Sequence, residues 1–243
     1  MPDFNVKQST CCNQILAALS AEDSERMRPH LHRVALIMEQ VLHEAGDPLE
    51  EVYFVEAGLV SLTANTGDHG MVEVGMTGRE GLVGTSALLS PHAQAIHRAL
   101  VQIGGSAWRM RSAVLREMME QSPALRDRCF GYLQVVMAQT SQSAACNARH
   151  ELPERLARWL LMSRDRADSD TIPMTQEFLS YMLGVRRAGV SIAVAALRAR
   201  GLIQQSRGHM AILDRAGLEQ QSCTCYRLIE DSRKQIMSAF QQH

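Results

Sequence analysis

The chain of 243 residues is long enough for one large domain or two small ones, and 46% of its residues are hydrophobic and 21% charged, as in an ordinary globular protein. Six cysteines are too few for a disulfide scaffold. The N-terminus lacks the basic and apolar regions of a signal peptide, and no run of about 18 apolar residues could span a membrane. We therefore expect a cytoplasmic protein that does not enter a membrane.

Charge is distributed unevenly along the chain, although the net charge is only −1. Residues 1–148 carry 11 Lys and Arg against 16 Asp and Glu, a net charge of −5, whereas residues 149–243 carry 14 against 10, a net charge of +4. Within 171–215 there are six arginines and two acidic residues. Such a basic segment is either a nucleic-acid-binding surface or the solvated face of a helix.

The first thirty residues are predicted to be helical, with Ser20 in position to cap a helix. From 34 to 110 the chain consists of short β-prone runs separated by glycines, and no helix of useful length fits between them. The runs are 52–55, 59–62, 71–74 and 99–103. Short strands at close spacing with glycine turns predict a small antiparallel sandwich or barrel.

A helical region follows the β-prone segment. Ser112 is predicted to cap its first helix, and Ser122 with Pro123 marks a second helix start. From 124 to 147 apolar and small residues at spacings of three and four form one stripe: Leu125, Cys129, Tyr132, Leu133, Val136, Met137, Thr140 and Ala144. We expect this helix to pack against its twin in a dimer; the alternative is a core helix of a single domain.

The segment after residue 150 contains a pair of short helices. An amphipathic helix over 152–161 and a polar loop over 164–170 come first. Thr175 is then predicted to cap one short helix, Gly184 to make the turn, and Gly201 to end a second helix that begins near residue 186. Two helices joined in this way form a helix-turn-helix.

The second of these helices begins with Arg186 and Arg187, so its first turn presents cations that suit phosphates and guanine edges. Two short β runs surround Arg207 and Gly208 and predict a hairpin, the wing of a winged helix. Arg207 at its tip is in position to meet the DNA backbone.

With these elements in this order, the chain resembles the Crp/Fnr family of bacterial transcription regulators. The resemblance covers nearly the whole chain. It rests on Thr175, Gly184, Arg187 and the residue pair 202–203 before the wing. It implies an α+β fold with an N-terminal cyclic-nucleotide-binding-like antiparallel β-roll, a long dimerisation helix and a C-terminal winged helix-turn-helix. The implied boundaries are 1–111, 112–148 and 149–243.

The resemblance implies a homodimer on double-stranded DNA, with its two recognition helices in successive major grooves about 34 Å apart on a pseudo-palindromic operator. RNA polymerase is a further candidate partner. The implied DNA-binding residues are Thr175, Gln176, Arg186, Arg187, Gly189, Ser191 and Arg207. The best-known members place a base-reading acidic residue after the arginine, whereas this chain has Ala188 and Gly189 there, so the operator sequence is not predicted.

The effector site departs from the cyclic-AMP-binding branch of the family. That branch holds the ribose and phosphate with a Gly-Glu pair and an Arg ten positions after the Glu; here the matching residues are Gly84, Thr85 and Ala95. Without a carboxylate and a guanidinium, nothing offsets the cost of burying a cyclic phosphate, so we do not expect cyclic AMP as effector. Arg98, the nearest cation, is predicted to point to the opposite face of its strand. The candidate pocket residues are Gly84, Thr85, Arg98, Thr140 and Ser141.

No metal or cofactor is expected. An iron–sulfur cluster needs about four thiolates, but the N-terminal run offers only Cys11 and Cys12, and the β-roll has no cysteine. Cys129 and Cys146 lie in the predicted dimerisation helix. Cys223 and Cys225 follow the wing and are interpreted as core or solvated thiols, since Cys-x-Cys alone is a weak metal signal.

Haem is not expected either, because scattered histidines, including the neighbouring His92 and His97, are more often surface residues. The main alternative function is a regulator of the same fold that responds to thiol oxidation. The sequence contains no nucleophile elbow, P-loop, dinucleotide fingerprint or His-Glu-x-x-His motif, so we do not expect an enzyme.

Overall fold

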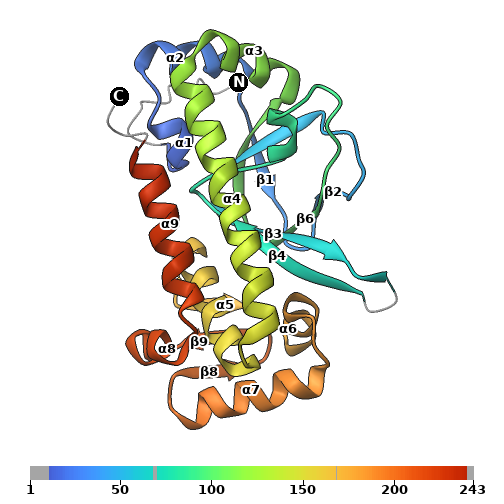
Figure 1. The fold of residues 1–243 in the computed structure, drawn as a ribbon, viewed down its shortest axis with the longest axis vertical. Coiled ribbons are helices and arrows are strands. Elements are labelled where there is room, and N and C mark those ends of the chain that lie inside the picture. The colour runs from blue at the N-terminus through green and yellow to red at the C-terminus, as the bar shows by residue number, and fades with distance from the viewer. Residues whose placement is uncertain (1–10, 68–69, 168, 240–243) are drawn as a thin grey trace.

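The computed structural model describes residues 11–67, 70–167 and 169–239. An antiparallel sheet lies at one end of the molecule and a smaller helical domain at the other, and one long helix, α4, runs past both (Figure 1). This arrangement confirms the predicted fold class.

The N-terminal sheet has six strands among the described residues, with the antiparallel order β1-β6-β3-β4, while β2 pairs with β6 and β5 with β3. The strands are β1 (His32–Leu36), β2 (Val41–His43), β3 (Glu51–Asn65), β4 (Met71–Thr77), β5 (Leu82–Val83) and β6 (Arg98–Arg111). The runs 52–55 and 59–62 form one strand rather than the two expected. Gly58 does not interrupt β3: its φ of 95° forms a bulge, and a Cβ there would lie 2.5 Å from the Ile103 carbonyl oxygen.

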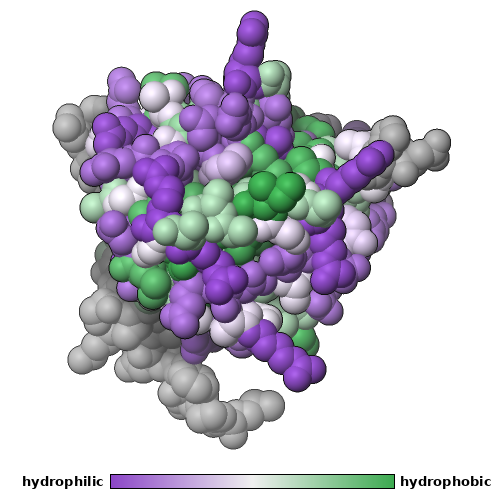
Figure 2. Space-filling model, turned by 90° about the horizontal axis from the view of Figure 1, so that it is seen from below, coloured by the Kyte–Doolittle hydropathy of each residue, from purple (hydrophilic) through white to green (hydrophobic). Residues whose placement is uncertain are grey.

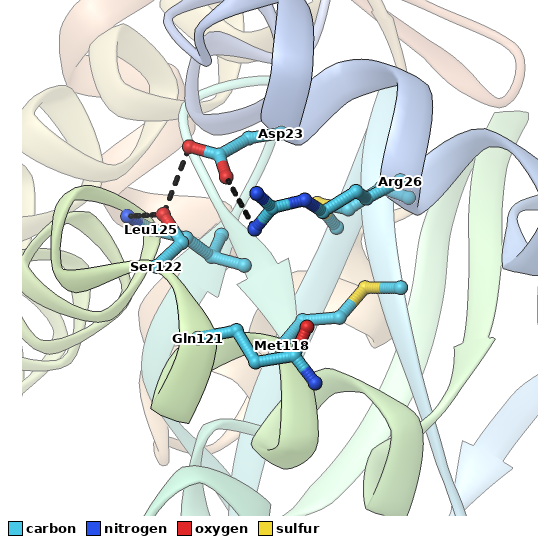
Figure 3. A pocket seen from close by; sticks show the side chains of 7 residues that line it. Asp23, Arg26, Met118, Gln121, Ser122 and Leu125 are labelled. Atoms are coloured by element: carbon cyan, nitrogen blue, oxygen red, sulfur yellow. Dashed lines mark hydrogen bonds and ion pairs between the residues drawn. The ribbon is translucent and has the colours of Figure 1, made fainter.

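Two short helices, α1 (Gln14–Ala17) and α2 (Ala21–Met27), precede the sheet, and Ser20 caps α2 as predicted. The 3₁₀ turns η2 (Arg28–His30) and η4 (Thr85–Leu88) complete this half. Figure 3 shows how α2 is tied to the helices that follow the sheet: the Ser122 hydroxyl donates to Asp23 at 2.8 Å and accepts from the Leu125 amide at 3.1 Å. The pocket in that view has a volume of only about 10 Å³, so this junction is packed and not a ligand site.

The predicted dimerisation segment consists of two helices, α3 (Ser112–Gln121) and α4 (Pro123–Arg149). Ser122 caps α4, with Pro123 in its first turn, as predicted. The prediction for Ser112 was wrong, because Arg111 is the N-cap residue of α3. The Ser112 hydroxyl instead donates to the Leu49 carbonyl oxygen at 2.5 Å, which anchors the helix to the sheet.

The apolar stripe of α4 faces the sheet of its own chain, so the predicted dimer face needs correction. Leu125, Cys129, Tyr132 and Val136 are buried in the core that α4 shares with the β-roll. Leu133 packs partly against the same core. Side chains enclosed in this way cannot reach a second chain. Of the predicted set, Met137 is the large apolar side chain that remains exposed, at 63%.

The C-terminal half packs three strands against a group of helices. Its elements are α5 (Leu152–Ala167), β7 (Thr171–Pro173), α6 (Gln176–Leu183), α7 (Arg187–Ala199), β8 (Ile203–Ser206), β9 (His209–Ile212), α8 (Arg215–Gln221) and α9 (Cys225–Ala239). The strand order is β7-β9-β8, and α9 lies along α4 (Figure 1). The polar stretch 164–170 was predicted as a loop, but α5 continues through its first four residues.

Buried contacts between α5 and the β-roll explain that extension and join the two halves. The Arg166 guanidinium, 4% exposed, donates to Glu80 at 2.6 Å and to Gln139 at 3.1 Å. The Trp159 indole N–H donates to Glu73 in β4 at 2.8 Å. Leu59 and other β-roll residues also enter the hydrophobic core of the C-terminal half. The C-terminal half is therefore docked on the β-roll of its own chain.

Candidate DNA-binding surface and sensor site

The helix-turn-helix consists of α6 and α7, which meet at an angle of 107°. The Thr175 hydroxyl accepts from the Phe178 amide at 3.1 Å and caps α6. Gly184 ends α6 with a φ of 62°, a conformation in which a side chain would be strained. These local signals place the N-terminus of α7 as the sequence predicted.

Helix α7 has one buried and one open side. Val190, Val194 and Leu197 are buried against the domain core. The open side carries Arg186 and Arg187 at its start, followed by small and apolar residues: Ala188, Ile192, Ala195, Ala196 and Ala199. Ile192, 72% exposed, is the large apolar side chain on this open side. Figure 2, which views the end of the molecule that carries α7, shows an apolar band with hydrophilic side chains on both sides.

Three other predicted contact residues have neighbours within the domain. The Gln176 side chain donates to Gln205 at 2.9 Å and accepts from the Ser191 hydroxyl at 2.6 Å, so it links α6, α7 and β8. Gly189 lies on the side of α7 that meets α5: a Cβ there would be 3.2 Å from Leu152. A side chain at Gly189 would crowd α5, so the glycine has a packing role there, and its contact with DNA stays a prediction.

The wing is the β8–β9 hairpin, whose turn contains Arg207 and Gly208. Gly208 has a φ of 75°, and its carbonyl oxygen accepts from the Met174 amide at 2.7 Å, which ties the wing to the start of α6. Arg207 is exposed at the turn. Thr175, the start of α7 and the wing are thus held in one rigid unit.

The β-roll has a small, partly open cavity next to Gly84 and Thr85, with a volume of about 20 Å³, room for roughly one water molecule. Ala95 and Ile96 line it where the cyclic-AMP-binding branch has its arginine. The other predicted pocket residues lie elsewhere. Arg98 pairs with Glu44 at 3.3 Å.

Thr140 and Ser141 are likewise absent from the lining of this cavity; they lie on α4, and Ser141 is exposed. The lining contains instead two histidines that the pocket prediction had not included, His43 and His97, and burial lowers the pKa of each. Both therefore favour the neutral form, and the cavity offers no cation for a phosphate.

Four potential metal ligands that are far apart in the sequence meet where α4 ends and α9 begins. Cys146, His150, Cys223 and Cys225 have one donor atom each within 4.8 Å of the others. The Cys146 and Cys223 sulfurs are 3.4 Å apart, and this hydrogen bond lowers the pKa of Cys146 and raises that of Cys223. The sequence had indicated only the short Cys-x-Cys pair, because 77 residues separate Cys146 from Cys223.

Two of the other cysteines, Cys11 and Cys129, are unlike these. Burial raises the pKa of Cys11 and of Cys129 to about 12, so neither thiol is activated.

Among the described residues no single helix is long and apolar enough to cross a membrane. Helices α6 and α7 taken together have the length and apolar composition of a membrane span, but they form a bent pair.

Comparison with known proteins identifies two family models in the chain. The cyclic nucleotide-binding domain model matches residues 34–122, and the Crp-like helix-turn-helix domain model matches residues 154–221. No curated protein sequence matches the chain.

Solved structures with a similar fold include three regulators. CLP of Xanthomonas campestris, described as a c-di-GMP responsive global regulator, has a TM-score of 0.66 and 18% identity, over 79% of this chain and 99% of that one. FixK2 of Bradyrhizobium japonicum has a TM-score of 0.67 and 17% identity, over 79% and 98%. A CRP-family transcriptional regulator of Thermus thermophilus, TTHB099, has a TM-score of 0.64 and 21% identity, over 78% and 96%.

The fold and the open basic helix define a helix-turn-helix DNA-binding protein with a β-roll of the cyclic-nucleotide-binding type. The two matched models, in the order that the resemblance implied, show the family. The chain belongs to the Crp/Fnr family of transcription regulators.

Proposed function

We propose that the protein is a homodimer that binds a pseudo-palindromic operator and regulates transcription there. The observation that carries this proposal is the open side of α7, where Arg186 and Arg187 precede a face of small residues and the exposed Ile192. Short side chains allow a helix to approach the floor of the major groove closely. The arginines at its N-terminus then lie where recognition helices contact base edges.

Each basic residue has a distinct role in this proposal. Arg187 reads a base, because it occupies the family's base-contacting position, while Arg186 and Arg207 bind phosphates. The Thr175 hydroxyl and the Gln176 amide meet a phosphate at the N-terminus of α6. Ile192 packs against the methyl group of a thymine, the contact that suits an apolar side chain in the major groove.

The proposed dimer uses the side of α4 that faces away from the β-roll. Phe130 and Met137 are 41% and 63% exposed, and with the exposed Ala144 they repeat every seven residues. A seven-residue repeat keeps the same side of a helix facing its twin along the whole contact. Two copies joined in this way present their α7 helices to successive grooves of one DNA face.

We further propose that cyclic AMP is not the effector. A cavity of about 20 Å³ lined by Ala95, Ile96 and neutral histidines has neither the room nor the cation that a cyclic phosphate needs. Calorimetry with cyclic AMP is expected to show no binding at micromolar concentrations. Micromolar binding together with tighter DNA binding would contradict this part of the proposal.

Selection from a random double-stranded DNA library tests the function as a whole. The bound sequences are expected to contain two inverted half-sites about one helical turn apart, and sedimentation of the complex is expected to show two chains per duplex. Enrichment of no sequence, or of a single half-site bound by one chain, would contradict the proposal.

A thiol-redox regulator of the same fold is the second candidate. The observation in its favour is the Cys146–Cys223 pair, whose sulfurs are 3.4 Å apart at the base of the DNA-binding domain. DNA titrations of reduced and oxidised protein distinguish the candidates, because a redox regulator must change its affinity when these two thiols form a disulfide.

A further inference from the structure

The four-residue cluster lies where the chain enters and leaves the DNA-binding domain. Cys146 and His150 are at the C-terminal end of α4, directly before α5. Cys223 lies between α8 and α9, and Cys225 is the first residue of α9. The helix-turn-helix model, 154–221, falls entirely between the two pairs. A ligand bound by all four side chains would therefore connect the segment that enters the DNA-binding domain with the segment that leaves it.

Local geometry directs each pair to a common point. Cys146 and His150 are four residues apart, one helical turn, so their side chains stand on one side of α4. Cys223 and Cys225 lie within one tight turn, in which the Tyr226 amide donates to the Cys223 carbonyl oxygen at 3.2 Å. Because α9 packs along α4, the second pair is brought against the first, and the His150 Nδ1 lies 3.5 Å from the Cys225 sulfur.

We propose that Cys146, His150, Cys223 and Cys225 bind one Zn²⁺ ion in a closed structural site. Three thiolates and one imidazole form one of the usual four-ligand sets of structural zinc. All four ligands come from the protein, so no position remains for a substrate, and the ion clips the DNA-binding domain to the end of α4.

The distances suit a single ion. With Zn–S bonds of about 2.3 Å, the ligand atoms of a tetrahedral site lie roughly 3.8 Å apart. Here the Cys146 and Cys223 sulfurs are 3.4 Å apart, the Cys225 sulfur and the His150 Nδ1 are 3.5 Å apart, and no pair of ligand atoms is more than 4.8 Å apart. An iron–sulfur cluster distributes its thiolates over several irons and needs ligands further apart.

The surroundings suit an anionic centre. Zn²⁺ with three thiolates carries one net negative charge, which needs compensation when buried. Arg158, 5% exposed, lies close enough to act electrostatically on Cys146 as well as on the Glu73 carboxyl group, and its Nε has no hydrogen-bond partner. The Gln142 amide donates to the Cys225 sulfur at 3.0 Å, the kind of outer contact that orients a thiolate ligand.

A disulfide between Cys146 and Cys223 explains less of this arrangement. It would be neutral, so it would add no negative charge beside the buried Arg158, and it would give Cys225 and His150 no role. A zinc site uses all four residues and the buried cation. It also fixes the position of α7 relative to α4, which goes beyond the proposed DNA-binding function.

Metal analysis of the full-length protein, purified under reducing conditions without chelator, tests the site independently of DNA. We expect about one zinc per chain by mass spectrometry. Cobalt added to the metal-free protein is expected to give the ligand-field bands of a tetrahedral site and a thiolate-to-cobalt charge-transfer band. Cys223→Ser should reduce the bound zinc at least tenfold, whereas the control Cys129→Ser, another buried cysteine on α4, should retain it.

Two results would overturn the proposal. One is wild-type protein that contains no stoichiometric zinc and shows no tetrahedral cobalt spectrum. The other is a Cys146–Cys223 disulfide found by alkylation and peptide mass spectrometry in protein isolated under the same reducing conditions. If Cys223→Ser does not fold, the wild-type zinc content and cobalt spectrum still decide. Because neither readout involves DNA, failure of the zinc site and failure of the proposed regulator function are distinguishable.

Discussion

Glu73 is a buried carboxyl group in the contact between the β-roll and the DNA-binding half, and its replacement by glutamine should change how stability depends on pH. Burial raises the pKa of Glu73 to about 7, although Arg158 and the Trp159 indole N–H favour its ionised form. A tenfold change in proton affinity corresponds to about 1.4 kcal/mol, so the ionised group opposes folding by about 3 kcal/mol above pH 7.

The direction of the pH dependence follows from the number of protons that the folded and unfolded chains bind. Between about pH 4.5 and pH 7 the unfolded chain loses the Glu73 proton while the folded chain keeps it, so the free energy of unfolding decreases as the pH rises. Glutamine is neutral at every pH and keeps a carbonyl oxygen for the Trp159 N–H. Glu73→Gln should therefore be more stable than the wild type by up to about 3 kcal/mol at pH 8, with the difference shrinking toward pH 5.

Urea denaturation at pH 5, 6, 7 and 8, followed by tryptophan fluorescence and by circular dichroism, measures this difference. Parallel stability curves for the two proteins across that range would refute the reasoning, because they would mean that Glu73 has the same proton affinity in the folded and unfolded chains.

Three further predictions concern other contacts. Arg166→Met leaves the buried Glu80 carboxylate without its partner and should lower the free energy of unfolding by about 3–5 kcal/mol in urea, and Arg166→Met combined with Glu80→Leu should restore most of it. Met137→Glu places a charge on the free side of α4 and should yield folded monomers in sedimentation, whereas Val136→Glu should unfold the chain; a folded Val136→Glu protein or an intact Met137→Glu dimer would contradict the assignment of the two sides. Thr175→Ala removes the cap of α6 and should cost about 1 kcal/mol of stability in thermal unfolding, and an unchanged melting curve would count against that cap.

The DNA-binding half could be predicted closely because its signals are local. Thr175, Gly184 and Gly208 each act within a few residues, as a cap, a turn and a hairpin, and the structure places all three accordingly. The same holds for Ser20 and Ser122 as helix caps. A cap or a left-handed glycine depends on its own backbone, so the sequence alone defines it.

Long-range contacts explain what the sequence did not predict. The periodicity of α4 shows that one side is apolar but not which surface covers it, and the β-roll of the same chain does so. Arg166 was assigned to a loop because its partner, Glu80, is distant in the sequence. The cluster at Cys146 and Cys223 depends on α9 returning along α4, which no local pattern indicates.

Titration of Arg187→Ala against the selected operator and a scrambled duplex, at two salt concentrations, tests the central claim most directly. Loss of a base contact should weaken operator binding by about 1–3 kcal/mol and leave scrambled DNA nearly unaffected. The matched control is Arg126→Ala, an exposed arginine in the first turn of α4, and α4 begins at the end of the molecule away from α7 (Figure 1). This variant should bind both duplexes like the wild type. If Arg187→Ala also binds both duplexes with wild-type affinity at both salt concentrations, α7 does not read DNA and the account is wrong.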